Sequence, residues 1–219
     1  MSSLTLLTHY VPTPKEDYTE LADLIVPARE SYCARHGYKH LVQRGMYGGF
    51  SYYAYGRLKL LRDYLDSPDA TQFVWVLNVQ SVLTNHTKQV TDVLDDEHDA
   101  YLTKDCHGLN LGSFVVRNTP WTKSWLDFII SLEPNYRFHP WHEQKAFMDF
   151  WLHENWTWMI HLLPQRALNS YQYQRYKPWP PHTPGNWRLG DLVLSLPGLN
   201  LQQRLEIVRS KEIQDSIIT

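Results

Sequence analysis

At 219 residues, the chain is long enough for one sizeable hydrophobic core or two small ones. A composition of 43% hydrophobic and 20% charged residues excludes an intrinsically disordered protein, and the net charge of −2 argues against a general attraction to nucleic acids or anionic membranes. Two cysteines are too few for a disulfide framework, and no apolar run approaches the ~20 residues of a membrane span. We therefore expect a cytoplasmic protein with no membrane span and no nucleic-acid partner.

The first half of the chain predicts alternating strands and helices. The signals for the first helix are Thr13 as N-cap, Pro14 in the first turn, Glu16 completing a capping box and Gly37 as a stop. The predicted elements are a strand over 3–8 that ends at Thr8-His9-Tyr10, that helix, a strand over 38–42, a helix over 53–65 and a strand over 73–77. This order predicts right-handed crossovers and a parallel sheet.

The strand over 73–77 stops abruptly on two amides, Asn78 and Gln80. Its five residues are all apolar, which is typical of a short strand buried on both faces. In open α/β sheets, ligands bind beyond the carboxyl ends of such strands. The two amides are therefore either ligand contacts or a polar turn that closes the strand.

Beyond Gln80 the pattern is less regular. The predicted elements are a short helix over 87–94, a strand over 112–117, a helix that opens at Thr119-Pro120, a helix over 143–152, a strand over 157–163, a loop over 171–187, a strand over 189–196 and a closing helix over 201–208. No internal repeat and no Ser/Gly linker is visible. We expect a single domain.

Several segments carry a resemblance to a known family. Residues 75–85 are similar to a Trp-x-Leu-Asp-x-Asp segment, and residues 108–118, Gly-Leu-Asn-Leu-Gly-Ser-Phe-Val-Val-Arg-Asn, are similar to a Gly-Leu-Asn-x-Gly-Ser-Phe-x-x-Arg-Asn segment. The segments 34–38, 143–144, 164–171 and 190–191 follow the same family's order. The family is glycosyltransferase family 34, and the resemblance covers roughly residues 4 to 200.

This resemblance implies a GT-A fold, with a Rossmann-like, mostly parallel central sheet flanked by helices. Residues 1–85 would form the nucleotide-binding half, and residues 100–219 the sugar and acceptor half. It further implies a nucleotide-diphosphate sugar donor, a glycan or other hydroxyl acceptor, and transfer of a hexose or pentose with retention at the anomeric carbon.

The chain departs from the family at its metal site. In the family two Asp residues and a His bind Mn²⁺, whereas Asn78, Gln80 and Ser195 stand at those positions here. A hard divalent cation prefers anionic oxygens, and each charge–charge term at ~4 Å contributes about 4 kcal/mol at an effective dielectric of 20. We therefore expect no metal cofactor. Either the amide NH₂ groups hold the diphosphate directly, or the chain is a catalytically inactive module that binds a glycan or a partner protein.

The resemblance also assigns residues to the donor. The base would lie over the end of the first strand, the ribose and diphosphate over the two amides, and the sugar against 110–113. By the resemblance, the donor-binding residues would be Thr8, His9, Tyr10, Asn78, Gln80, Asn110, Gly112 and Ser113. Independently of the resemblance, cationic side chains are candidates to neutralise the leaving diphosphate, because guanidinium groups match phosphate oxygens; these are Arg57, Lys59, Arg204 and Arg209.

Gln144 is the predicted catalytic residue, with its carbonyl oxygen facing the anomeric carbon. Glu143 is either a nucleophile, a base for the acceptor, or a solvated residue in a first helical turn. The predicted acceptor-binding residues, which could instead cap a turn or cover the core, are Gln165, Arg166, Asn169, Tyr173 and Trp179. The His139/His142 pair is predicted to be structural, because its spacing does not suit a metal site.

Overall fold

The computed structural model describes residues 3–12, 17–50, 52–151, 156–172 and 183–217. Its centre is a six-stranded sheet with the order β2-β1-β3-β6-β5-β7. The strands are β1 (Leu4–Tyr10), β2 (Lys39–Arg44), β3 (Phe73–Leu77), β5 (Ala100–Asp105), β6 (Gly108–Arg117) and β7 (Ile160–Leu163). β6 is antiparallel to both of its neighbours, and the other pairs are parallel. The predicted α/β class with a mostly parallel sheet is confirmed.

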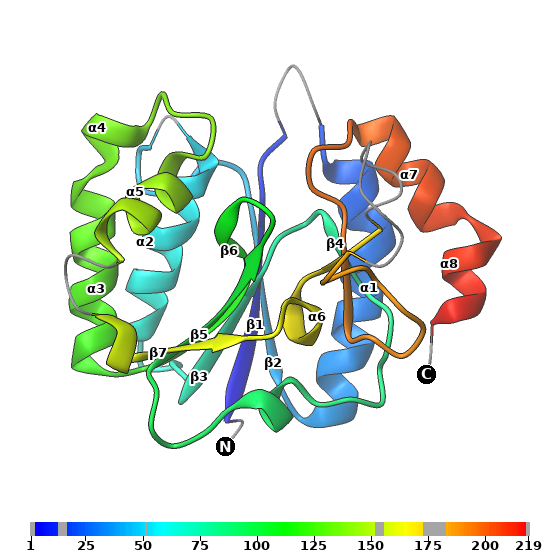
Figure 1. The fold of residues 1–219 in the computed structure, drawn as a ribbon, viewed down its shortest axis with the longest axis horizontal. Helices are drawn as coiled ribbons and strands as arrows, with labels where there is room; N and C mark the ends of the chain where they lie inside the picture. The colour runs from blue at the N-terminus through cyan, green and yellow to red at the C-terminus, as the bar shows by residue number, and fades with distance from the viewer. Residues whose placement is uncertain (1–2, 13–16, 51, 152–155, 173–182, 218–219) are drawn as a thin grey trace.

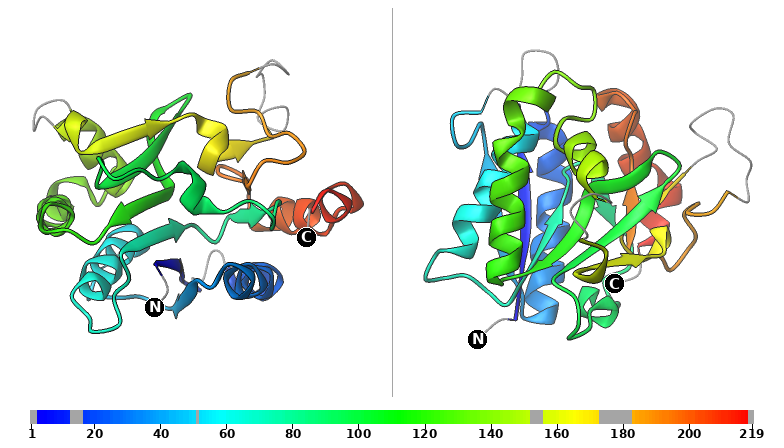
Figure 2. Two further views of the ribbon diagram at one scale, coloured as in Figure 1. Left: turned by 90° about the horizontal axis from the view of Figure 1, so that it is seen from below. Right: turned by 60° about the vertical axis from the view of Figure 1, so that its left-hand side comes forward.

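Helices cover both faces of this sheet, as Figures 1 and 2 show. They are α1 (Thr19–His36), α2 (Tyr53–Leu65), α3 (Pro120–Ser131), α4 (Glu133–Tyr136), α5 (His142–Phe150), α6 (Gln165–Leu168), α7 (Leu201–Arg209) and α8 (Lys211–Ser216), with 3-10 turns η1 (Val90–Val93) and η2 (Trp156–Trp158). α2, α3 and α5 pack on one face, while α1 and α7 lie on the other. Among the described residues, no helix combines the length and apolarity needed to cross a membrane.

β3 is buried on both faces because its side chains alternate between two cores. Val74 and Val76 join the core under α2 and α3, and Trp75 and Leu77 join the core under α1. All five residues of the strand are buried. The apolar run therefore has the role that its length and composition predicted.

A second, three-stranded sheet brings late residues to the end of β3. Its order is β4-β9-β8, with β4 at Ser81–Leu83, β9 at Val193–Ser195 and β8 at Ser170–Tyr171. β4 pairs antiparallel with β9, so that Ser81 lies opposite Ser195. Local sequence pattern predicts neither β4 nor this separate sheet.

Several predicted boundaries need correction. The α1 helix is described from Thr19, and the capping box predicted at residues 13–16 lies outside the described residues. The strand predicted over 112–117 is longer, and β5, which pairs with it, was missed. The predicted cap at Thr119 is present, since its hydroxyl accepts from the Thr122 backbone N–H at 3.2 Å.

Candidate functional site

Asn78, Gln80 and Ser195 line one small pocket, although the first two follow β3 and the third ends β9. The pairing of β4 with β9 brings Ser195 close to the residues that follow β3, and the hydroxyls of Ser81 and Ser195 lie 2.8 Å apart. The Asn78 Oδ1 atom accepts from the Gln80 backbone N–H at 3.4 Å. The Gln80 side chain makes no hydrogen bond to another described residue. Both side-chain NH₂ groups are therefore available as donors at the pocket.

A buried guanidinium supports this turn from within the protein. Arg29 of α1 donates to the Thr8 hydroxyl at 2.7 Å. It also donates to the backbone carbonyls of Leu77 at 3.0 Å, Asn78 at 2.7 Å and Ser81 at 2.7 Å. Burial lowers the pKa of Arg29 to about 9, which leaves the group cationic at neutral pH. No carboxylate among the described residues pairs with it, so a positive charge lies directly behind the pocket.

The sequence interpretation missed Arg29, which lies on the buried face of α1. The residues buried with it on α1 include Ala22, Ile25, Tyr32 and Cys33. An arginine at helical spacing within an apolar stripe was the signal that could have identified it.

Asn110 and Tyr171 form a hydrogen-bonded wall beside the pocket. The Asn110 amide donates to Asp105 Oδ2 and to the Tyr171 hydroxyl, both at 2.7 Å. The Tyr171 hydroxyl donates to Asp105 Oδ2 at 2.7 Å and accepts from the Asn169 amide at 3.1 Å. Asn110 Oδ1 accepts from the Gly112 N–H at 2.7 Å, and a Cβ at Gly112 would lie 2.9 Å from that oxygen. This close approach explains the glycine.

A wider cavity of about 420 Å³ adjoins the small pocket and shares Asn110 and Tyr171 with it. Gln144, at the start of α5, lines this cavity, and its Oε1 accepts from the Leu111 N–H at 3.2 Å. Trp141 also lines it and is 40% exposed. The cavity thus joins the predicted catalytic residue to an exposed aromatic ring that the sequence interpretation did not select.

Glu143 and Arg57 form a buried ion pair, with 2.9 Å between Arg57 NH2 and Glu143 Oε1. Neither residue lines the two pockets described above. The alternative of a solvated first turn for Glu143 is wrong, because the side chain packs inside the protein. The structure places Arg57, predicted as a donor-binding cation, against this carboxylate, with its Nε and NH1 atoms buried and unpartnered.

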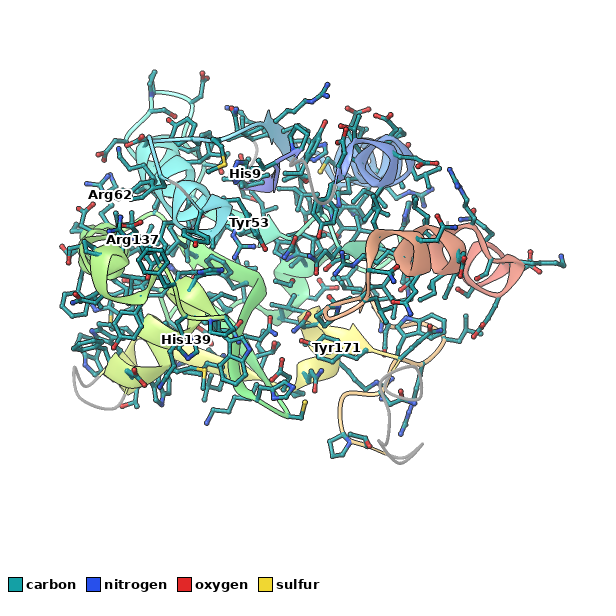
Figure 3. The ribbon with its side chains drawn as sticks, turned by 90° about the horizontal axis from the view of Figure 1, so that it is seen from above. His9, Tyr53, Arg62, Arg137, His139 and Tyr171 are labelled. Carbon is teal, nitrogen blue, oxygen red and sulfur yellow. The ribbon has the colours of Figure 1, made fainter. Side chains whose placement is uncertain are left out.

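The end of β1, predicted to lie under the nucleotide base, is buried inside the protein. The Thr8 hydroxyl is engaged by Arg29 and by His40 Nε2 at 3.0 Å. His9 donates from Nε2 to the Gly45 carbonyl at 2.8 Å, and its Nδ1 is buried without a partner. Burial lowers the pKa of His9, which favours the neutral ring. Figure 3 shows His9 beside Tyr53, across the top of the molecule from Tyr171, and Tyr10 packs in an apolar cluster.

The remaining predicted donor residues are placed around this centre. Ser113 is buried and accepts from the Trp75 indole N–H at 3.0 Å. Arg204 donates to the Leu196 carbonyl at 3.0 Å and to the Tyr18 hydroxyl at 2.9 Å. The structure does not bring Lys59 and Arg209 into the two pockets, since they pair with Asp63 and Glu20 near the surface.

The predicted acceptor residues lie on and after α6. Gln165 and Arg166 line a cavity of about 650 Å³. Arg166 forms a two-pronged ion pair with Asp191, at 3.0 and 2.6 Å, and Gln165 donates to the Asn169 carbonyl at 3.0 Å. Tyr173 and Trp179, predicted as parts of an acceptor lid, lie outside the described residues.

Comparison with known proteins identifies relatives at the sequence level. Residues 94–206 match the model of the galactosyl transferase GMA12/MNN10 family. The probable alpha-1,6-mannosyltransferase MNN10 of Saccharomyces cerevisiae is 25% identical over 183 residues, which cover 65% of this chain and 46% of that protein. An uncharacterized alpha-1,2-galactosyltransferase, C637.06, of Schizosaccharomyces pombe is 36% identical over 76 residues, which cover 32% of this chain and 21% of that protein. The chain therefore matches less than half of each relative's length.

Solved structures share the fold at low identity. A glycosyltransferase involved in glycosylation of the major capsid of PBCV-1 has a TM-score of 0.72 and 17% identity, covering 94% of this chain and 98% of that one. The galactosyltransferase LgtC, solved with donor and acceptor sugar analogs, has a TM-score of 0.60 and 11% identity, covering 97% and 99%. These similarities confirm the predicted GT-A architecture.

Proposed function

The chain belongs to the galactosyl transferase GMA12/MNN10 family, and from that membership we propose that it is a glycosyltransferase using a nucleotide-diphosphate sugar. The relatives named above are described as mannosyl- and galactosyltransferases. The proposed donor is therefore a GDP- or UDP-linked hexose, and the acceptor is a glycan or another hydroxyl compound. The alternative sugar is a pentose, and assays with a set of nucleotide-linked hexoses and pentoses would distinguish the two.

The observation that carries the proposal is the neutral pocket backed by Arg29. Asn78, Gln80 and Ser195 offer two amides and a hydroxyl, a donor set that does not fit a hard divalent cation. The same groups can donate hydrogen bonds to phosphate oxygens, and the buried guanidinium contributes a positive charge behind them. We assign the diphosphate to this pocket, held without a metal ion.

Charge bookkeeping supports a site of this kind. The charges of two carboxylates and of the Mn²⁺ ion that they bind add up to zero. The two amides here also have a summed charge of zero. Replacing both acids therefore removes the need for the cation without making the pocket more negative. Arg29 then leaves a net positive charge for the diphosphate in either case.

The sugar would lie between the small pocket and the wider cavity. There the amide of Asn110 is held rigidly by Asp105 and Tyr171, and the Gln144 carbonyl faces the same space. Glu143 does not supply a free carboxylate to this space, because its side chain is buried in an ion pair with Arg57. These positions favour attack by the acceptor oxygen on the face from which the diphosphate leaves. The acceptor's proton then passes to the departing β-phosphate oxygen, and the configuration is retained.

In this proposal Gln144 stabilises the positive charge that develops at the anomeric carbon. Its carbonyl oxygen has a second lone pair beyond the one used by the Leu111 N–H. The acceptor sugar would stack on Trp141, since flat aromatic rings with exposed faces suit the apolar faces of sugars.

Thermal unfolding in the presence of nucleotides tests the proposal. UDP or GDP should raise the melting temperature, and the shift should be the same with EDTA as with Mn²⁺. Binding at 100 times Kd adds about 2.7 kcal/mol to the stability, so a real site gives a readily measured shift. UDP-galactose and GDP-mannose with simple sugar acceptors would then be assayed for product.

Gln80→Glu is the matched variant, because it keeps the size of the side chain and adds a negative charge beside the diphosphate. It should weaken nucleotide binding. A shift that requires Mn²⁺ would overturn the metal-free site. No shift with any nucleoside diphosphate at millimolar concentration would instead favour an inactive module that binds a glycan or a protein.

A further inference from the structure

Three metal-ligating side chains meet at the edge of the sheet opposite the donor pocket. Among the described residues, Asp95, His98 and His161 form a group whose ligand atoms all lie within 4.8 Å of one another. The Nδ1 atoms of His98 and His161 lie 2.9 and 3.0 Å from Asp95 Oδ2. The two imidazole rings have centroids 4.8 Å apart. One carboxylate oxygen thus lies between two ring nitrogens.

The position of the group follows from the sheet. β5 and β7 are parallel neighbours, with Ala100 opposite Ile160 and Tyr101 opposite His161. Asp95 and His98 come from the loop that leads into β5, and His161 is the second residue of β7, so all three residues lie where these strands begin. The donor pocket lies beyond the end of β3, which runs parallel to them. The group and the donor pocket therefore lie toward opposite ends of parallel strands.

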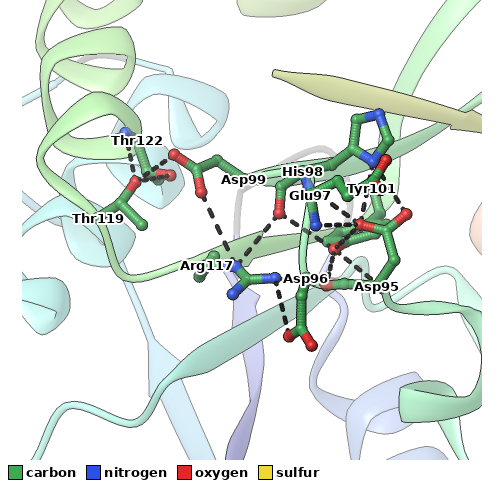
Figure 4. Close-up of polar contacts among 9 residues, drawn as sticks. All are labelled: Asp95, Asp96, Glu97, His98, Asp99, Tyr101, Arg117, Thr119 and Thr122. Carbon is green, nitrogen blue, oxygen red and sulfur yellow. Dashed lines mark hydrogen bonds and ion pairs between the residues drawn. The ribbon is translucent and has the colours of Figure 1, made fainter. Parts of the chain in front are cut away.

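The loop that carries two of the ligands is held firmly, as Figure 4 shows. Asp95 Oδ1 accepts from the backbone N–H groups of Glu97 at 3.0 Å and His98 at 2.9 Å, and from the buried Tyr101 hydroxyl at 3.0 Å. Arg117 donates to the carbonyls of Asp95 and His98. Oδ1 also lies 3.0 Å from His98 Nδ1, whereas Oδ2 lies within hydrogen-bond distance of both histidines. Such fixing of a ligand by its neighbours is typical of built metal sites.

One cation and two further acids lie around the group. Arg117, which donates to the carbonyls of Asp95 and His98, also lies 3.7 Å from the Asp96 carboxylate and 3.8 Å from the Asp99 carboxylate. These two carboxylates offset its charge, so it does not exclude a divalent cation.

We propose that Asp95, His98 and His161 bind one borderline divalent cation of the Zn²⁺ type. Two imidazole nitrogens and one carboxylate oxygen suit Zn²⁺, at about 2.0–2.2 Å each, which spaces tetrahedral ligand atoms about 3.3 Å apart. The carboxylate–imidazole distances are already close to that spacing, and only the two histidines must approach each other. Water completes the fourth position.

The ion would tie the loop before β5 to β7, the edge strand of the sheet. The side chains of His98, Asp95 and His161 are 23%, 34% and 41% exposed, so an ion can reach them from solvent. The alternative is a plain hydrogen-bonded triad, in which both rings donate to the carboxylate. A metal replaces those two protons, which links its binding to pH.

Calorimetric titration of the full chain with ZnCl₂ tests the proposal, with Co²⁺ absorption as a second readout of tetrahedral coordination. One equivalent of Zn²⁺ should bind and raise the melting temperature. His161→Ala should weaken binding by at least ~100-fold, since changes even to partners of metal ligands cost 10–100-fold. His98→Ala should do the same. The melting curve of each variant without metal shows that it is folded.

His107→Ala is the matched control, because His107 is an exposed histidine that does not belong to the proposed ligand group. It should leave the affinity unchanged. Loss of binding in this variant, or binding that persists undiminished in folded His161→Ala, would overturn the assignment. So would the absence of Zn²⁺ and Co²⁺ binding by the unaltered chain, which would establish the hydrogen-bonded triad. Anomalous scattering from a zinc-soaked crystal would locate the ion directly.

Discussion

The Arg57 guanidinium of α2 lies 2.9 Å from Glu143 Oε1 of α5, with side chains only 4% and 7% exposed. This pair fastens the start of α5 to α2. The next residue, Gln144, is thereby held against β6, where its carbonyl reaches the Leu111 N–H. The ion pair consequently orients the proposed catalytic amide without itself reaching the sugar.

Arg57→Met should strongly destabilise the protein, because it leaves the Glu143 carboxylate buried without its partner. Removing one member of a buried pair costs about 3–5 kcal/mol of unfolding free energy. Urea denaturation measures the loss. Lys59→Met is the control on the same helix, since the Lys59–Asp63 pair is partly exposed and such pairs contribute about 0–1 kcal/mol. Equal losses in the two variants would contradict a buried role for Arg57.

Gln144→Ala should lower kcat by about 10²-fold with a small change in KM. The expected loss corresponds to removing one group that stabilises charge in the transition state. Steady-state kinetics with the donor identified by nucleotide binding provide the measurement. A large rise in KM with unchanged kcat would instead assign Gln144 to substrate binding alone.

Acid should destabilise the protein partly through His40. Burial, followed by the charge of Arg29, lowers the pKa of His40 from 6.5 to about 4. Between these values the unfolded chain binds a proton that the folded chain does not, so stability falls as pH falls from 6.5 towards 4. The slope is at most about 1.4 kcal/mol per pH unit, and less with partial solvent screening.

His40→Gln removes this titration and keeps an amide for the Thr8 hydroxyl. Its unfolding free energy should therefore decrease less steeply with acid than that of the unaltered chain. Denaturation curves at pH 4.5, 5.5 and 7 would be compared. Parallel pH profiles for the two proteins would show that the pKa of His40 is the same in the folded and unfolded states.

The central strand and its flanking helices were predictable because their signals are local. Five apolar residues predict β3, and Thr119-Pro120 begins α3 with the expected hydroxyl cap. β5 was missed because an acidic segment precedes it and its identity as a strand depends on pairing with β6 and β7. Pairing between distant segments leaves no periodic signal within either segment.

The same limit applies to the site. Family resemblance predicted that Ser195 stands with Asn78, whereas local pattern could not, because the β4–β9 pairing creates the contact. The Asp95–His161 contact joins residues 66 positions apart and was not foreseen. Arg29 was overlooked because an arginine in a helix is usually solvated, and its burial depends on carbonyls from β3 and β4.

Restoring acids to the donor pocket should create a metal site. Asn78→Asp, Gln80→Asp and Ser195→His together supply two carboxylates and an imidazole to positions that already share one pocket. Titration calorimetry should detect Mn²⁺ binding that is negligible at this pocket in the unaltered chain. The single variant Asn78→Asp serves as control and should bind more weakly than the triple variant. Mn²⁺ affinity unchanged by the triple substitution would show that these positions do not converge as described.

Trp141→Ala should raise KM for the acceptor by about 10-fold and leave nucleotide binding unaltered. Trp141 is 40% exposed and lines the cavity that Gln144 also lines, so its ring is available to stack on a sugar. Loss of an aromatic contact of this kind costs about 1–1.4 kcal/mol, which is a fivefold to tenfold change in affinity. Trp158→Ala is the matched control, because Trp158 is 65% exposed but lies in η2, outside the cavity. Kinetics with acceptor varied at saturating donor separate the two variants. An equal effect of both substitutions, or an effect of Trp141→Ala on donor KM alone, would place the acceptor elsewhere, with the 650 Å³ cavity beside Gln165 and Arg166 as the next position to test.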